Sequence, residues 1–166
     1  MAIWRKGGIN LALVVVALIG GLVTSASISG WFNTRVRPAG AAPNWVIGPV
    51  WDVRFVLMAV ALYLTWTAPD GPKKKRAMQL HLGQLVLNGA WSCAFFALQS
   101  LLAGAVVIVI LWIFILLTIL SFRKISRPAA WMLVPYIIWV TIAGSVNYGF
   151  LALNGPRFKD ANLSYS

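Results

Sequence analysis

Five apolar segments, each about twenty residues long, constrain the fold of this chain more than any other feature. A membrane-spanning α-helix needs about 20 mostly apolar residues, because the hydrocarbon core of a bilayer is about 30 Å thick. Of the 166 residues, 60% are hydrophobic and 10% are charged, which is too apolar for a soluble domain of this size. The sequence therefore predicts an all-α integral membrane protein, a single domain formed by a bundle of five transmembrane helices. The expected helices span residues 9–28, 45–66, 78–99, 101–122 and 128–154, and the first two are joined by a long loop over residues 29–44.

Basic residues between the apolar segments predict the orientation of the bundle. The chain has 14 Lys and Arg residues against 3 Asp and Glu, and the loops on the side of the N-terminus carry most of the basic ones. The positive-inside bias then places the N-terminus in the cytoplasm. We expect a multi-pass integral membrane protein. Since the basic residues do not form a stripe along a polar helix, no nucleic-acid partner is expected.

Amide side chains inside the apolar segments mark candidate functional positions. Gln84, Asn88, Trp91 and Phe95 follow one another at spacings of four, three and four residues, and therefore share one face of the third helix. Asn147 lies inside the fifth segment. Lipid offers no hydrogen bonds to an amide, so these side chains should face protein or a cavity. Asn88 either bonds a neighbouring helix or donates to a ligand carbonyl or carboxylate, and both readings stay open.

Aromatic residues accompany these amides on two other segments. Trp51 and Phe55 are four residues apart on the second helix, and Trp139 and Ala143 are four apart on the fifth. The small Ala143 leaves space beside the indole, where a flat ligand would fit. Buried amides beside indoles suit a pocket for a flat and mostly apolar molecule. Trp45 has the alternative role of an anchor at the membrane interface.

Charged residues also occur inside the second segment, at Asp52 and Arg54. A charge costs about 2.5–3.5 kcal/mol at the centre of a membrane helix on insertion scales, and less near its end. Both residues lie near the start of the segment, so their side chains can reach the interface. Arg54 is a candidate partner for a ligand carboxylate, and Asp52 is a candidate for a proton step.

The sequence contains no residue set for hydrolytic or metal-dependent catalysis. It has three acidic residues, one histidine (His81) and one cysteine (Cys93), and no P-loop or haem-attachment motif. We therefore expect no metal site, no required cofactor and no confidently assigned catalytic residue.

Four stretches of tryptophan, proline and amide residues follow one another along residues 20–154. They read Gly30-Trp31-Phe32; Pro43-x-Trp45 with Pro49-Val50-Trp51; Gln84-Leu85-x-Leu87-Asn88-x-x-Trp91 with Phe95-Phe96; and Val134-Pro135-Tyr136-x-x-Trp139 with Ala143, Asn147 and Leu153-Asn154. In this order the stretches resemble the TspO/MBR family, the translocator proteins or tryptophan-rich sensory proteins, also known as peripheral-type benzodiazepine receptor homologues.

The resemblance implies a five-helix bundle, often dimeric, that binds tetrapyrroles such as protoporphyrin IX and haem, along with other lipophilic ligands. It also implies a pocket between the helices, with the loop over residues 29–44 as its lid. Carried over to this sequence, the pocket lining is Trp51, Phe55, Asn88, Phe95, Trp139 and Ala143. Further candidate ligand or lid contacts are Phe32, Trp45, Arg54, Gln84 and Asn147.

The function expected from this resemblance is tetrapyrrole binding in porphyrin handling, sensing or stress response. The expected partners are the lipid membrane, the tetrapyrrole and a second copy of the chain. The resemblance is to a bacterial member of the family, so the expected location is a bacterial cell membrane, with the outer membrane open as an alternative. Two alternatives are slow porphyrin degradation by light and oxygen at Trp51 and Trp139, and transport of porphyrins or other lipophiles. Phe32 stands where the family usually has tyrosine, which removes a phenol that such degradation could use.

Overall fold

The computed structural model describes residue 38 and residues 43–154, apart from the side chains of residues 44, 45, 47, 48 and 51. This part of the chain is helical and contains no β-strand. The expected helix over residues 9–28 and nearly all of the loop over residues 29–44 lie outside the described residues. The described helices are α2 (Asn44–Trp66), α3 (Pro72–Ser92), the π-helix η2 (Cys93–Ala97), α4 (Leu101–Arg123), α5 (Arg127–Met132) and α6 (Val134–Asn154).

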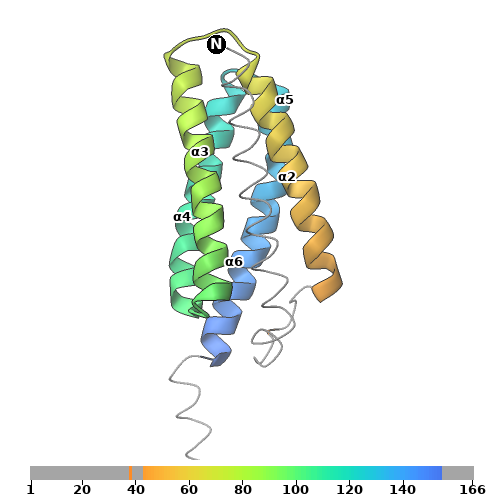
Figure 1. The fold of residues 1–166 in the computed structure, drawn as a ribbon, viewed down its shortest axis with the longest axis vertical. Helices are drawn as coiled ribbons and strands as arrows, with labels where there is room; N and C mark the ends of the chain where they lie inside the picture. The colour runs from red at the N-terminus through yellow and green to blue at the C-terminus, as the bar shows by residue number, and fades with distance from the viewer. Residues whose placement is uncertain (1–37, 39–42, 155–166) are drawn as a thin grey trace, which may run out of the picture.

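The four long helices α2, α3, α4 and α6 lie side by side along the long axis of the molecule (Figure 1). Helix α4 packs against α3 on one side and against α6 on the other, and α5 contacts α2 and α4. The connection between α3 and α4 is short and uncharged, and the two helices form an antiparallel hairpin. The turn uses Gln99 in the left-handed conformation, with φ of 51°, and the Ser100 side chain then caps α4 by accepting from the Ala103 backbone N–H at 3.2 Å.

Helix α3 begins at Pro72, six residues before the predicted start at residue 78. Proline is favoured in the first helical turn, where its missing N–H has no intrahelical partner to lose. The basic run 73–76, expected in a loop, therefore forms the first turns of α3. Lys74 reaches back to the C-terminal end of α2, where its Nζ donates to the carbonyls of Trp66 at 2.5 Å and Ala68 at 2.7 Å.

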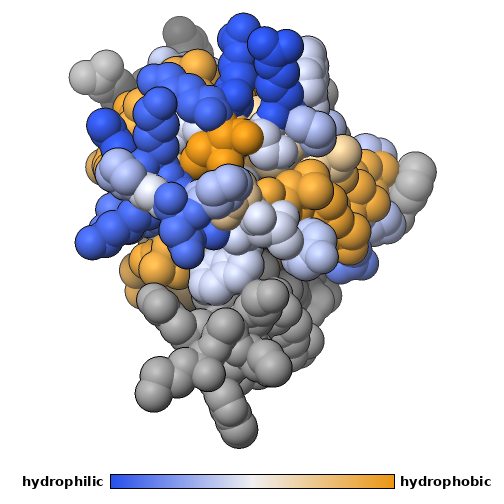
Figure 2. Space-filling view, turned by 90° about the horizontal axis from the view of Figure 1, so that it is seen from above, coloured by the Kyte–Doolittle hydropathy of each residue, from blue (hydrophilic) through white to orange (hydrophobic). Residues whose placement is uncertain are grey.

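The exposed basic residues of the described chain gather at one end of the bundle, where α2 joins α3 and α4 joins α5. Figure 2 shows hydrophilic side chains spread over this end. The two connections were expected on one side of the membrane, and the structure places them at the same end. The residues are Lys73, Lys75, Arg76, Arg123, Lys124 and Arg127.

The end of α3 also differs from the prediction of one α-helix over residues 78–99. After Ser92 the backbone widens into η2, in which Leu98 N–H donates to the carbonyl of Cys93, five residues earlier, at 2.8 Å. The wider turn lets the consecutive side chains of Phe95 and Phe96 both be buried, with exposures of 3% and 4%. Hydrophobic periodicity alone does not reveal such a local change of helix type.

The predicted helix over residues 128–154 is divided into α5 and α6 at Leu133. Pro135 causes the division, because it has no N–H to donate to the carbonyl of Trp131 and its ring crowds that carbonyl. Leu133 N–H bonds instead to the Ala130 carbonyl at 3.1 Å, and the Ile137 N–H bonds to the Leu133 carbonyl at 3.1 Å.

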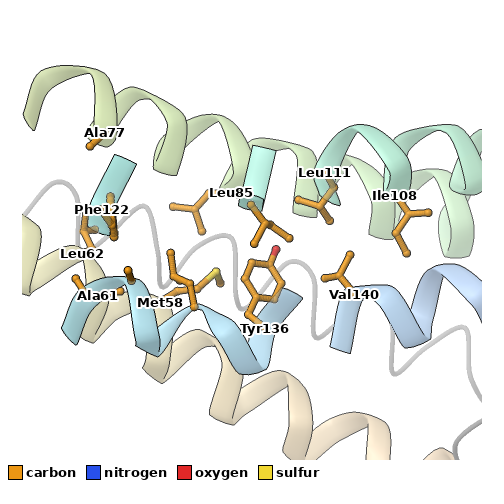
Figure 3. Close-up of a cluster of buried hydrophobic side chains, with 14 residues drawn as sticks. Met58, Ala61, Leu62, Ala77, Leu85, Ile108, Leu111, Phe122, Tyr136 and Val140 are labelled. Atoms are coloured by element: carbon orange, nitrogen blue, oxygen red, sulfur yellow. The ribbon is translucent and has the colours of Figure 1, made fainter. Parts of the chain in front are cut away.

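A hydrophobic core runs between the helices, and Figure 3 shows Tyr136 of α6 among its side chains. The segments 101–123 and 127–154 are long and apolar enough to cross a membrane, by length and composition. Only 28% of the most apolar stretch in each is buried, whereas the core helix of a soluble protein is mostly buried. Their outward faces expose large apolar side chains, which include Val106, Val109, Ile113, Leu117, Ile138 and Ile142.

Candidate functional site

A buried polar network joins α2, α3 and α6 near the middle of the bundle. Arg54 is 5% exposed, and its Nη2 donates to Oδ1 of Asn88 at 3.3 Å. Nδ2 of Asn88 donates in turn to the hydroxyl of Tyr136 at 2.7 Å. Asn88 and Tyr136 are each 1% exposed. The Asn88 amide, expected to bond either a helix or a ligand, therefore bonds two neighbouring helices at once.

The hydrogen bonds of this network have a fixed direction. A guanidinium can only donate, so the Asn88 oxygen must face Arg54 and its NH₂ group must face Tyr136. The phenol oxygen accepts from Asn88, which leaves its own hydrogen to donate elsewhere.

Two aromatic rings flank the Arg54 guanidinium. Its central carbon lies 4.8 Å from the ring centroid of Phe55 and 5.2 Å from that of Tyr136. Such cation–π contacts stabilise a cation away from water. The sequence interpretation allowed the Arg54 side chain to extend to the membrane interface. In the structure this side chain is instead held inside the protein. Asp52, two residues earlier, is exposed and takes no part in the network.

A second polar cluster lies further along α3 and α6. Trp91 Nε1 donates to Oδ1 of Asn147 at 3.3 Å, and Nδ2 of Asn147 donates to the backbone carbonyl of Leu101 at 3.1 Å. The Trp91 indole stacks on Phe95, with ring centroids 5.3 Å apart and planes 18° apart. Phe95 also meets Phe150 edge to face at 6.3 Å. Phe95 is thus part of a packed aromatic cluster.

Half-buried residues occupy the stretch of α6 between the two polar clusters. Trp139, Ala143 and Asn147 lie three, seven and eleven residues after Tyr136, so all four share one stripe of the helix. Tyr136 and Asn147 are buried, while Trp139 and Ala143 between them are only half-buried. Phe55 on α2 and Trp91 on α3 are half-buried as well. The candidate site is therefore a less densely covered aromatic stretch, bounded at each end by a hydrogen-bonded amide.

Gln84 lies one turn before Asn88 and belongs to a different cluster. Its Nε2 lies 2.9 Å from Nδ1 of His81, and the His81 ring stacks on Phe122 with centroids 5.4 Å apart. Oε1 of Gln84 and Nε2 of His81 are buried and have no hydrogen-bond partner among the described residues. The structure thus separates Gln84 from the candidate site.

Three predicted site residues remain without a described side chain. The backbones of Trp45 and Trp51 lie in α2, with Trp51 one turn before Phe55, and Phe32 lies outside the described residues. Conversely, Tyr136 was not predicted to belong to the site. Its spacing of three residues before Trp139 was the available signal.

Helix α4 approaches the second polar cluster closely at Gly104. A Cβ atom added at Gly104 of α4 would lie 2.9 Å from Oδ1 of Asn147 and 2.9 Å from Cδ2 of Phe95. We expect Gly104→Ala to destabilise the protein by about 1–3 kcal/mol, as other overpacked substitutions do. Denaturant unfolding followed by circular dichroism measures the change.

The matched control is Gly89→Ala on α3, where nothing lies within 4 Å of the added Cβ. Because alanine favours a helix over glycine, this variant should be unchanged or more stable by up to about 1 kcal/mol. Equal effects of the two substitutions would show that the crossing at Gly104 is not tight.

The fold and the site together define a class: over the described residues, a helical bundle with two helices long and apolar enough to cross a membrane and with amide networks between its helices. Comparison with known proteins narrows the class. Residues 9–153 match the model of the TspO/MBR family, and the chain belongs to that family.

Relatives from three kinds of organism share this family. The chain is 42% identical to the tryptophan-rich protein TspO of Chlorobaculum tepidum, over 88% of this chain and 92% of the relative. It is 33% identical to the protein of the same name from Archaeoglobus fulgidus, over 87% and 93%. It is 30% identical to the translocator protein of Ovis aries, over 87% and 89%. The family consists of membrane proteins, and membership supports a membrane sensory or translocator role.

Proposed function

We propose that this protein binds tetrapyrroles such as protoporphyrin IX or haem inside a five-helix membrane bundle, in porphyrin handling, sensing or stress response. The single observation that carries the proposal is the aromatic stretch of α6 between two buried amide networks. Its half-buried Trp139 and Ala143 offer a flat apolar surface, and polar groups lie at both ends. A few convergent polar groups beside a large apolar surface are typical of small-molecule sites.

The remaining parts of the proposal follow from the sequence and the family. The segment 9–28 supplies the fifth spanning helix, and the loop over residues 29–44 covers the site as a lid. One described residue of that loop supports this placement: a Cβ added at Gly149 of α6 would lie 2.7 Å from Cβ of Pro38. Pro38 of the loop therefore lies against α6 just beyond Asn147. We further propose a cytoplasmic N-terminus in a bacterial cell membrane and assembly as a homodimer.

The proposal is tested by titrating purified protein with protoporphyrin IX in the dark, following the quenching of tryptophan fluorescence. We expect saturable quenching at one pigment per chain, weakened several-fold in Trp51→Phe, which removes an indole from the expected lining. A linear decrease without saturation in the folded protein would contradict the proposal. The matched control is Trp131→Phe, because Trp131 is 70% exposed on α5 and is not part of either polar cluster.

A further inference from the structure

We infer that the exposed basic residues at one end of the bundle form a binding surface for the headgroups of anionic phospholipids. The surface lies where α2 joins α3 and where α4 joins α5, at the end seen in Figure 2. This basic surface consists of Lys73, Lys75, Arg76, Arg123, Lys124 and Arg127. The inference goes beyond the proposed function, because it does not require a tetrapyrrole in the bundle.

The antiparallel packing of α3 and α4 brings two separate parts of the chain to this surface. The start of α3 lies beside the end of α4, where the His81 ring stacks on Phe122 with centroids 5.4 Å apart. Phe122 directly precedes the basic residues at the end of α4. The basic residues of segments 73–76 and 123–127 therefore share one surface.

The described part of the chain leaves the charge of this surface in excess. At this end of the bundle the acidic residue among the described residues is Asp70, and its Oδ1 lies 2.9 Å from Nζ of Lys74. Lys74 also donates to backbone carbonyls at the end of α2. The six residues of the basic surface form no ion pair within the described ranges. The surface is therefore strongly positive and attracts anions.

The first turns of α3 carry basic residues where a helix favours acidic ones. The N-terminal end of a helix bears a partial positive charge, which anions stabilise and cations do not. Lys73, Lys75 and Arg76 lie at this end, and the first turn of α3 contains no acidic residue. Within the fold this arrangement is unfavourable. An anion bound from outside would be stabilised by the side chains and by the helix end together.

The basic surface borders apolar side chains that face outward. On α3, Lys75 lies seven residues before Leu82, which is 57% exposed, and both share one face. Seven residues correspond to about 10 Å along a helix, whereas the headgroup region of one leaflet is about 5–8 Å thick. On α4, Leu120 is 45% exposed and lies three residues before Arg123. Long basic side chains span such distances, so their charged groups reach the lipid phosphates.

An exposed tryptophan lies at the same boundary. Trp131 is 70% exposed and follows Arg127 by four residues on α5, so the two side chains share one face. Tryptophan is enriched at the headgroup level of membranes. An anionic phospholipid suits both features, because its phosphate meets the basic groups and its acyl chains cover the adjoining apolar faces. A soluble anion would meet the charges alone.

The test measures which phospholipids the purified protein retains. Protein in detergent is incubated with equal amounts of dioleoyl phosphatidylglycerol and dioleoyl phosphatidylcholine, which share their acyl chains but differ in headgroup charge. After gel filtration, the retained lipids are extracted and quantified by mass spectrometry. We expect the wild-type protein to retain at least about fivefold more phosphatidylglycerol, as basic clusters beside membrane helices favour anionic lipids. In about 1 M salt the preference should fall below about twofold, because the Debye length is then about 3 Å.

Replacing all six residues of the basic surface with glutamine should also reduce the preference below about twofold. The matched control combines Lys73→Arg, Lys75→Arg and Lys124→Arg, which keep every charge and should keep the preference. Circular dichroism checks that both variants fold. Tetrapyrrole binding by the glutamine variant should equal that of the wild-type protein, so the two proposals are tested separately.

Equal retention of the two lipids by the wild-type protein would overturn the inference without any variant. The basic residues would then serve only to orient the chain during insertion. A wild-type preference in the glutamine variant would place the lipid site elsewhere and would equally overturn it. If excess glycerol 3-phosphate abolished the preference, the surface would bind soluble phosphates, and the assignment to lipid would be wrong.

Discussion

Replacing Ala143 with phenylalanine is expected to lower the affinity for protoporphyrin IX by about 30-fold or more. Ala143 is half-buried on the stripe of α6 between Tyr136 and Asn147. A benzyl group there would occupy the surface that the flat pigment needs. Forcing the pigment into an overfilled site costs about 2 kcal/mol or more, and about 2 kcal/mol corresponds to a 30-fold change in the dissociation constant. The dark fluorescence titration measures this change directly.

The control for this variant is Ala152→Phe, which adds the same side chain to an exposed position on the same helix. We expect its pigment affinity to match that of the wild-type protein. Circular dichroism and gel filtration confirm that both variants keep the bundle. If Ala143→Phe folds and binds the pigment normally, the site does not lie along this stripe of α6.

Replacing Asn88 with leucine is expected to destabilise the protein by about 3 kcal/mol. Leucine has the same branching as asparagine but neither accepts from Arg54 nor donates to Tyr136, which are 5% and 1% exposed. Removing one partner of a buried charged group is strongly destabilising, because that group loses its hydrogen bond and cannot regain water. The midpoint and slope of denaturant unfolding, extrapolated to water, give the change in free energy.

Gln79→Leu is the matched control, because it makes the same amide-to-leucine change at an exposed position of α3. We expect it to alter the free energy of unfolding by less than about 0.5 kcal/mol, as surface substitutions usually do. A similar effect of the two substitutions would mean that the hydrogen bonds of Asn88 contribute little to stability.

The sequence predicts well those features that depend on local composition and helical spacing. The all-helical class follows from the long apolar segments, and the α3–α4 hairpin follows from the short connection at Gln99 and Ser100. The shared faces also follow from spacing: Asn88 and Asn147 are buried, as amides inside apolar segments should be. Periodicity of this kind is a property of one helix and needs no knowledge of its neighbours.

Features that depend on contacts between helices could not be predicted in the same way. The hydrogen bond from Arg54 to Asn88 joins residues 34 positions apart, and that from Asn88 to Tyr136 joins residues 48 apart. A guanidinium near the start of an apolar segment has two outcomes, extension to the interface or burial with partners. Only the arrangement of α2, α3 and α6 decides between them.

Backbone irregularities form a second group that the sequence did not reveal. The π-helix η2 contains neither proline nor glycine, so no local residue signals the change of helix type. The early start of α3 did have a signal, Pro72, but the charged run after it resembled a membrane loop in composition. Charge and hydropathy locate membrane boundaries, whereas a helix continues past the membrane wherever its backbone and caps allow.

The most direct test of the central claim is the crystal structure of the protein with protoporphyrin IX bound. The account predicts the tetrapyrrole ring against Trp139 and Ala143, between the two hydrogen-bonded amides Asn88 and Asn147. A pigment bound instead on the outward faces of α4 and α6, with the Arg54–Asn88–Tyr136 network unchanged, would contradict the account.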